Sequence, residues 1–304
     1  MQQDKELSQY EQATAVLPSK LRRAALLEPR KHQLLAEEFR LRTGRSMTLL
    51  LPEGEADTGV LVEPEDLEAL CNQAAEFSRY AAIETIRQGY LPIRGGGRVG
   101  LCGSAVMKDG ACANLRDFSS ASVRIAREKK GIGEAVIPRL FREGHFQSTL
   151  ILSPPGGGKT TLLRDLVRSL SDGSGGNPGL RVSLADERGE IAVLRQGEPQ
   201  MDVGERTDVL DGCRKAVAVP MLLRAMNPEV IAVDEITVRE DIEAMTMAAN
   251  CGVKLLATIH AGSVSELTYK PLYAQMLSAK VFSLAVVIHR SGAERHYEVE
   301  ELPC

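Results

Sequence analysis

The feature that most constrains this chain of 304 residues is a glycine-rich turn between an apolar segment and a helical segment. Residues 148–152 are largely apolar, as in a buried strand, and residues 161–170 carry leucine and valine at the spacing of one helical face. The turn between them contains Pro155, Gly156, Gly157, Gly158, Lys159, Thr160 and Thr161. A strand, a glycine-rich turn and a helix in this order predict a phosphate-binding loop.

The residue types in this turn fit that chemistry. Glycines let backbone N–H groups curve around phosphates at a helix N-terminus, where the helix dipole adds to the attraction. We therefore predict that residues 155–161 bind the phosphates of ATP, with Lys159 reaching the β- and γ-phosphates and Thr160 offering its hydroxyl to Mg²⁺. Ser153 stands where the motif has its first glycine, so the start of the loop is expected to differ while the phosphate cradle is kept.

A second motif lies downstream, where the apolar residues 230–233 are followed by Asp234 and Glu235. Asp234 is predicted to hold Mg²⁺ and Glu235 to be the general base that activates water. The alternative is a pair of acids that caps the next helix.

A general base at Glu235 favours hydrolysis by water over phosphoryl transfer to a small molecule. The chain has no N-K-x-D motif, which a GTPase would use to read the base of its nucleotide. Residues 253–259 predict another buried strand, and His260 after it is either a γ-phosphate sensor or structural.

Composition narrows the function classes. A net charge of −4 and 4% aromatic residues weigh against nucleic-acid binding. The six cysteines are scattered without a C-x-x-C pair, so free thiols are expected rather than a zinc site. No signal peptide is recognised, and the longest apolar run, residues 281–288, is far shorter than a bilayer span. We expect a cytoplasmic protein that reaches a membrane only peripherally or through a partner.

Two domains are expected. Residues 15–45 show helical spacing, residues 64–88 predict a helix, and residues 90–127 predict short strands with a hairpin at Asp109 and Gly110. Residues 134–142 predict a further helix. With a boundary near 146, residues 1–146 form a small α+β domain for assembly or regulation, and residues 147–304 an α/β P-loop domain with a mainly parallel sheet.

Several segments together resemble the stage III sporulation protein AA family: 159–165, 186–192, 206–211, 226–236, 93–101 and 123–129. The resemblance covers about residues 15 to 290. It implies a RecA-like ATPase related to type II and type IV secretion motors, acting in the mother cell of an endospore-forming bacterium. Implied partners are identical subunits in a hexameric ring, with ATP between them, and membrane proteins of the channel to the forespore.

The same resemblance carries residue roles. Asp186 and Glu187 match the acidic box of secretion ATPases, which implies a metal role for Asp186 and a catalytic role for Glu187, while His260 matches their histidine box. Besides Ser153, Thr237 and Ala261 depart from the family pattern, each standing where a glycine is common. No charged catalytic group is lost by these departures.

The developing charge at the γ-phosphate calls for one more cation, which P-loop enzymes commonly supply as an arginine. Arg206 and Arg224 are the candidates in the ATPase domain, and Arg124 and Arg127 in the N-terminal domain. The alternative is that each of these arginines forms an ion pair at the surface or at an interface.

Two alternative functions stay open: a RecA-like ATPase that acts on nucleic acid through the basic residues 124–130, and a nucleotide-binding scaffold with little turnover.

Overall fold

The computed structural model of the chain has two compact units, Met1–Arg127 and Glu128–Cys304. It describes residues 2–76, 86–87, 89–126, 128–291 and 294–302. The division lies before the boundary predicted near residue 146. Residues 128–146 belong to the second unit because Val136, Leu140 and Phe146 are buried in its core.

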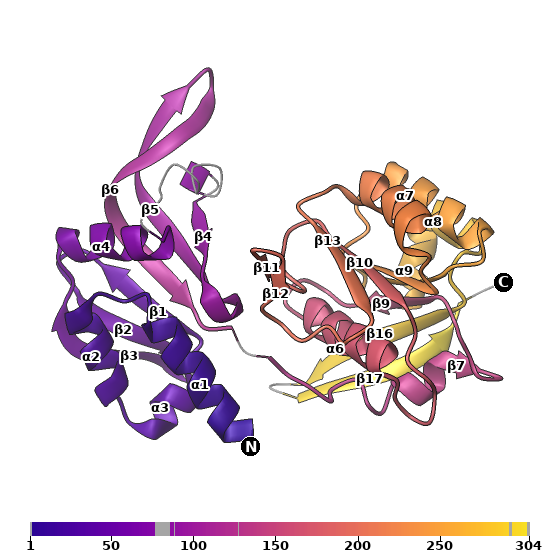
Figure 1. The fold of residues 1–304 in the computed structure, drawn as a ribbon, viewed down its shortest axis with the longest axis horizontal. Helices are drawn as coiled ribbons and strands as arrows, with labels where there is room; N and C mark the ends of the chain where they lie inside the picture. Colours follow the sequence, from indigo (N-terminus) through magenta and orange to yellow (C-terminus); the bar gives the residue numbers. More distant parts are fainter. Residues whose placement is uncertain (1, 77–85, 88, 127, 292–293, 303–304) are drawn as a thin grey trace. The chain divides into compact units, whose positions relative to one another are not determined.

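The first unit is an antiparallel sheet with helices packed on it (Figure 1). Among the described residues its strand order is β3-β2-β1-β6-β5-β4. The elements are α1 (Gln2–Thr14), α2 (Ser19–Leu27), α3 (Arg30–Leu35), β1 (Glu38–Arg42), β2 (Ser46–Leu51), β3 (Gly54–Leu61), α4 (Pro64–Ala74), β4 (Tyr90–Pro92), the 3₁₀ turn η1 (Arg94–Gly96), β5 (Arg98–Lys108) and β6 (Ala111–Arg124). The hairpin predicted at Asp109 and Gly110 is confirmed, because these residues join β5 to β6.

One prediction for this unit is partly wrong, and another extends into residues that the structure does not describe. The helical spacing over residues 15–45 holds for α2, where Leu21 and Ala25 are buried, but Phe39 belongs to strand β1 and faces the core from there. The helix predicted over residues 64–88 is confirmed as far as α4 extends, and residues 77–85 and 88 lie outside the described part.

The second unit is a largely parallel sheet in the order β13-β10-β14-β15-β9-β16-β17, in which only the pairing of β16 with β17 is antiparallel among the described strands. Its strands are β9 (Thr149–Leu152), β10 (Val182–Asp186), β13 (Thr207–Asp211), β14 (Val230–Val233), β15 (Lys254–Ile259), β16 (Leu284–Ser291) and β17 (Glu294–Glu301). Short pairs outside it are β7 (Phe141–Arg142) with β8 (His145–Phe146), and β11 (Leu194–Arg195) with β12 (Glu198–Pro199). The helices are η2 (Ile137–Leu140), α6 (Lys159–Asp172), α7 (Lys215–Met226), α8 (Arg239–Asn250), α9 (Val264–Tyr269) and α10 (Pro271–Ser278).

Helices cover both faces of this sheet, which explains why its inner strands are apolar at successive positions. Ile151 and Leu184 pack with α6 on one face, whereas Leu150 and Ala185 pack with α7 and α8 on the other. Figure 1 shows α6 and the pair α7 and α8 on opposite sides of the strands. The strands and the helix predicted around the glycine-rich turn are confirmed as β9, β14, β15 and α6.

The helix predicted over residues 134–142 is not formed. The segment is a single 3₁₀ turn, η2, followed by the short strand β7. Pro138 lies inside the predicted helix, where it lacks the N–H that an α-helix needs and clashes with the preceding turn.

Candidate active site

The predicted phosphate loop, the two acids and the histidine follow strands that are neighbours in the second sheet. β15 lies between β9 and β14, and all three run parallel. The loop after β9, Asp234 and Glu235 after β14, and His260 after β15 therefore meet at the carboxyl edge of the sheet. Open parallel sheets bind their ligands in the crevice at this edge.

The backbone of the phosphate loop requires its glycines. Gly156 and Gly158 have φ of 73° and 101°, in the left-handed region that favours glycine. A Cβ added to Gly157 would lie 1.6 Å from the hydroxyl oxygen of Ser153. Ser153 is buried, and its hydroxyl donates to the carbonyl oxygen of Pro154 at 3.1 Å. The loop therefore needs glycine at these positions, and its backbone packs directly against the buried Ser153 side chain.

Lys159 begins α6, and its ammonium points back into this loop. Nζ donates to the carbonyl oxygen of Ser153 at 2.9 Å and lies 2.8 Å from Nδ1 of His260. An ammonium only donates, so Nδ1 accepts and the ring proton is assigned to Nε2. Burial lowers the pKa of Lys159, and the charges of Asp234 and Glu235 offset only part of that effect.

Thr160 and Asp234 fit a magnesium ion. The Thr160 hydroxyl donates to Oδ2 of Asp234 at 3.0 Å, and the Thr258 hydroxyl donates to Oδ1 at 2.5 Å. Hydroxyl and carboxylate oxygens are ligands that Mg²⁺ prefers. The described residues hold no group of three or more His, Cys, Asp or Glu side chains suited to a metal. The candidate ligands for an ion here are the Thr160 hydroxyl and the Asp234 carboxylate.

Glu235 is held on both sides of its carboxylate. Oε2 accepts from Nη1 of Arg188 at 3.0 Å, and Oε1 lies 3.0 Å from Nε2 of His260. Its φ is 45°, a left-handed conformation that costs a non-glycine residue about 1–3 kcal/mol and is common at functional sites. Its N–H donates to the Thr258 hydroxyl at 2.8 Å.

The role of Thr258 in positioning the two acids was not predicted from the sequence. Its hydroxyl donates to Asp234 and accepts from the backbone of Glu235, and its side chain is fully buried. It therefore orients both acids at once. The available signal was a hydroxyl residue inside the otherwise apolar end of a buried strand.

The comparisons with known proteins identify the family. The family model described as sporulation stage III, protein AA matches residues 7–298. The chain belongs to the stage III sporulation protein AA family. The stage III sporulation protein AA of Bacillus subtilis (strain 168) is 37% identical over 276 residues, which cover 91% of this chain and 90% of that protein.

Solved structures give the fold. The ATPase DotB of Legionella pneumophila matches with a TM-score of 0.57 and 16% identity, covering 88% of this chain and 76% of that chain. The pilus retraction motor PilT with bound ADP matches with a TM-score of 0.60 and 15% identity, covering 88% and 79%. The predicted α/β, RecA-like fold is confirmed. No described helix is both long and apolar enough to cross a membrane.

Asp186, to which the family resemblance gave a metal role, holds a backbone turn in this conformation. This side chain is buried, and its two carboxylate oxygens accept from the N–H groups of Glu190, Ile191 and Ala192 at 2.9–3.0 Å. Burial raises the pKa of Asp186 although these backbone hydrogen bonds oppose the shift. These contacts hold the turn that follows β10, and the metal role of Asp186 stays a prediction.

Glu187, the other acid of this segment, forms an ion pair with Lys215, whose side chain is 7% exposed at the start of α7. Burial alone would raise the pKa of Glu187, but the hydrogen bond and charge of Lys215 outweigh it and hold the pKa below its ordinary value. The carboxylate is therefore committed to a structural contact in this conformation.

The predicted arginines lie elsewhere. Arg206 precedes β13 and donates to the carbonyl oxygen of Ser171, and Arg224 lies in the last turn of α7, just before β14. Both are therefore at the amino edge of the sheet, opposite the phosphate loop, and neither reaches the loop of its own chain. Arg124 belongs to β6 in the first unit, and Arg127 is outside the described residues.

An arginine that sequence reasoning did not single out contacts the loop instead. Nε of Arg295, in β17, donates to the carbonyl oxygen of Gly157 at 3.0 Å. The two residues are 138 positions apart, and only the strand order of the sheet brings them together, so no local motif could have indicated the contact.

Proposed function

We propose that this chain is a magnesium-dependent ATPase that energises or assembles the channel complex between mother cell and forespore. The observation that carries the proposal is the meeting of Lys159, Thr160, Asp234 and Glu235 at one edge of the sheet. The sporulation name of the Bacillus subtilis relative and the ATPase fold support the two halves of the proposal.

The residues divide the work as follows. Backbone N–H groups of the loop and the Lys159 ammonium bind the ATP phosphates. Thr160 and Asp234 would hold Mg²⁺, which would supply positive charge to the phosphates. Glu235 accepts a proton from the attacking water as the water oxygen bonds to the γ-phosphorus, and the bond from that phosphorus to the β–γ bridging oxygen breaks with its electron pair leaving on ADP.

The assembly around this chemistry rests on the family resemblance. We place the protein in the mother-cell cytoplasm as a hexameric ring that meets the membrane through channel proteins, with the first unit as its assembly domain. A ring predicts that specific ATPase activity rises with protein concentration, and a proteoliposome of the channel proteins should recruit the protein where a lipid-only vesicle does not.

The test of the site is nucleotide binding by Lys159→Ala. Removing a charged phosphate ligand should weaken Mg·ATP binding about 10- to 100-fold, since a hydrogen bond to a charged group is worth roughly 1.5–3 kcal/mol. Lys254→Ala is the matched control, because Lys254 begins β15 at the opposite edge of the sheet. Equal affinity of a folded Lys159→Ala variant and the wild type would sink the phosphate-loop assignment. Turnover that requires DNA would favour the nucleic-acid alternative.

A further inference from the structure

The last two strands of the sheet extend past the edge where the phosphate loop lies. β16 runs parallel to β9, and Val287 pairs with Leu152, the last residue of β9. β16 then continues to Ser291. At about 3.3 Å per residue, the hairpin of β16 and β17 reaches about 10 Å beyond Val287 at Arg290, which pairs with Arg295. Arg295 thus lies beside the loop that leaves β9.

Arg295 packs directly on the backbone of that loop. Nε donates to the carbonyl oxygen of Gly157, and a Cβ added to Gly158 would lie 2.9 Å from Nε and 3.6 Å from Cζ. The guanidinium can approach this closely only because residue 158 is glycine. Gly158 immediately precedes Lys159, so the guanidinium lies against the last turn before the phosphate-binding lysine.

The hydrogen bonding of Arg295 sets it apart from nearby arginines. Arg188 is paired with the carboxylate of Glu235, and Arg168 with that of Asp165. Arg295 is bound to a neutral carbonyl, which leaves its charge uncompensated by that contact. Arg164 in α6 also donates to neutral carbonyl oxygens, those of Glu190 and Ile191, but it uses two of its nitrogen atoms, whereas the Gly157 contact of Arg295 uses Nε alone. A guanidinium has further N–H donors beyond Nε and binds phosphate oxygens with two of them at once.

We propose that Arg295 is a phosphate-binding arginine that each chain supplies to its own nucleotide. Arg295 would provide the additional positive charge at the phosphates that the sequence led us to expect from an arginine. Arg206 and Arg224 of the same chain lie at the opposite edge of the sheet and do not reach the loop. The inference rests on the proposed ATPase function and deepens it, because it names the residue and makes the contribution intramolecular.

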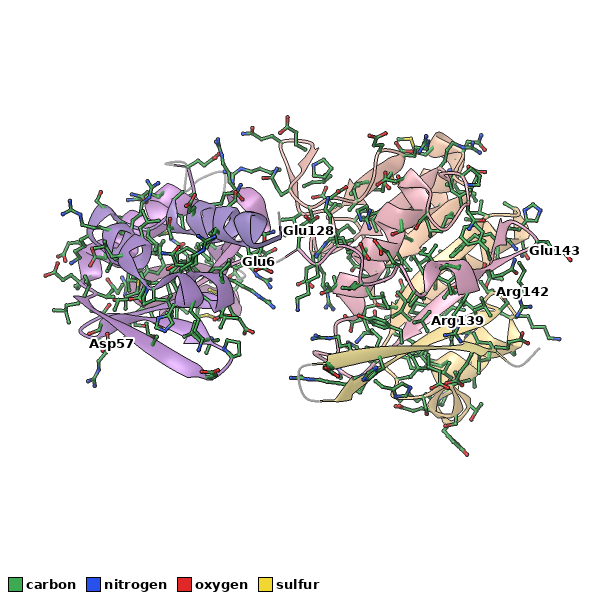
Figure 2. All side chains as sticks on the ribbon, turned by 90° about the horizontal axis from the view of Figure 1, so that it is seen from below. Glu6, Asp57, Glu128, Arg139, Arg142 and Glu143 are labelled. Atoms are coloured by element: carbon green, nitrogen blue, oxygen red, sulfur yellow. The ribbon has the colours of Figure 1, made fainter. Side chains whose placement is uncertain are left out.

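The test compares full-length Arg295→Ala, Arg295→Lys and wild type in steady-state ATP turnover and in binding of a fluorescent ATP analogue. An arginine at the γ-phosphate is worth about 10³ or more in kcat, so Arg295→Ala should lose about that factor, with a smaller change in KM. Arg295→Lys keeps the charge and should recover at least about tenfold over the alanine variant. Arg142→Ala is the control: Arg142, labelled in Figure 2, pairs with Glu301 at the far end of β17 and should keep wild-type turnover.

Mixing Lys159→Ala chains with Arg295→Ala chains tests the intramolecular claim. No activity should return, because neither chain has both groups; restored activity would overturn the assignment. Wild-type kcat in Arg295→Ala, or equal losses in the lysine and alanine variants together with a lowered melting temperature, would also overturn it. If the wild type binds ATP but does not hydrolyse it, the proposed function fails, whereas ATP affinity at least about tenfold weaker in Arg295→Ala would still support this phosphate contact.

Discussion

Among single residues, Glu187 offers a sharp distinction between a catalytic and a structural acid. Glu187→Gln leaves the Lys215 ammonium, only 7% exposed, without its counter-charge. Stability should fall by about 1–3 kcal/mol, the cost of leaving a buried charged group unpaired. Chemical denaturation of the two proteins measures the difference, and a nucleotide-saturated kcat close to wild type is expected.

The pH dependence of that difference follows from the lowered pKa of Glu187. The folded state binds the proton less tightly than the unfolded state does, so the contribution is complete above the unfolded pKa of about 4.5 and is lost as pH falls through the folded pKa. The two proteins should therefore converge in stability in acid. A constant gap between pH 7 and pH 3 would contradict the ion-pair account.

How far individual residues could be predicted depends on where their partners lie. Lys159 and Thr160 are set by a local turn, and Asp234 and Glu235 by the end of one strand, so sequence order indicates them. Thr258 and Arg295 act through neighbours in the sheet that are distant in sequence. A hydroxyl residue in an apolar strand end marked Thr258 as unusual but did not indicate its partners, and nothing local marked Arg295. The roles of the predicted site residues remain predictions.

Among the elements, the segment after Glu128 is hydrogen-bonded to α6, the helix that follows the phosphate loop, and packs against it. The carboxylate of Asp165 in α6 accepts from the N–H groups of Gly131 and Gly133 at 3.0 and 2.8 Å and is 3% exposed. A Cβ on Gly133 would lie 2.7 Å from Leu166 Cδ2, so only glycine packs this closely on α6. Figure 2 labels Glu128, from which this segment begins.

Asp165→Asn replaces one accepting oxygen with an amide that faces an N–H donor. We expect a loss of about 2–3 kcal/mol in the free energy of unfolding. Glu243→Gln is the control, because Glu243 forms an exposed pair with Arg239 on α8 and should cost at most about 0.5 kcal/mol. Equal stability of both variants would show that the hydrogen bonds from Gly131 and Gly133 to Asp165 contribute nothing to the free energy of unfolding.

The same segment shows the limit of prediction at the level of elements. Helical spacing over residues 134–142 came from side chains that are indeed buried, among them Val136 and Leu140. Pro138 and the two glycines before it instead produce a 3₁₀ turn on the surface of α6. Apolar spacing located the buried positions, and the backbone chemistry of proline and glycine decided the conformation.

For the whole molecule, the units differ from the predicted domains by residues 128–146. A fragment of residues 128–304 should fold on its own, with one cooperative transition. A fragment of residues 147–304 lacks Val136, Ile137, Leu140 and Phe146, all at most 3% exposed, and should be destabilised or aggregate. Thermal melting of the two fragments measures this, and equal melting temperatures would restore the boundary near 146. The boundary near 146 was suggested by the polar or small residues Gly144, His145 and Gln147, which flank the buried Phe146.

The most direct measurement of the central claim is phosphate release from Mg·ATP by the wild type and by Glu235→Gln at saturating nucleotide, with binding measured in parallel. Glutamine keeps the shape of the side chain but not its basicity, and a general base contributes about 10² to 10⁴ in rate. The account predicts that Glu235→Gln binds ATP about as well as the wild type and turns it over at least about 100-fold more slowly. Equal rates in the two proteins, or no phosphate release by the assembled wild type, would contradict it.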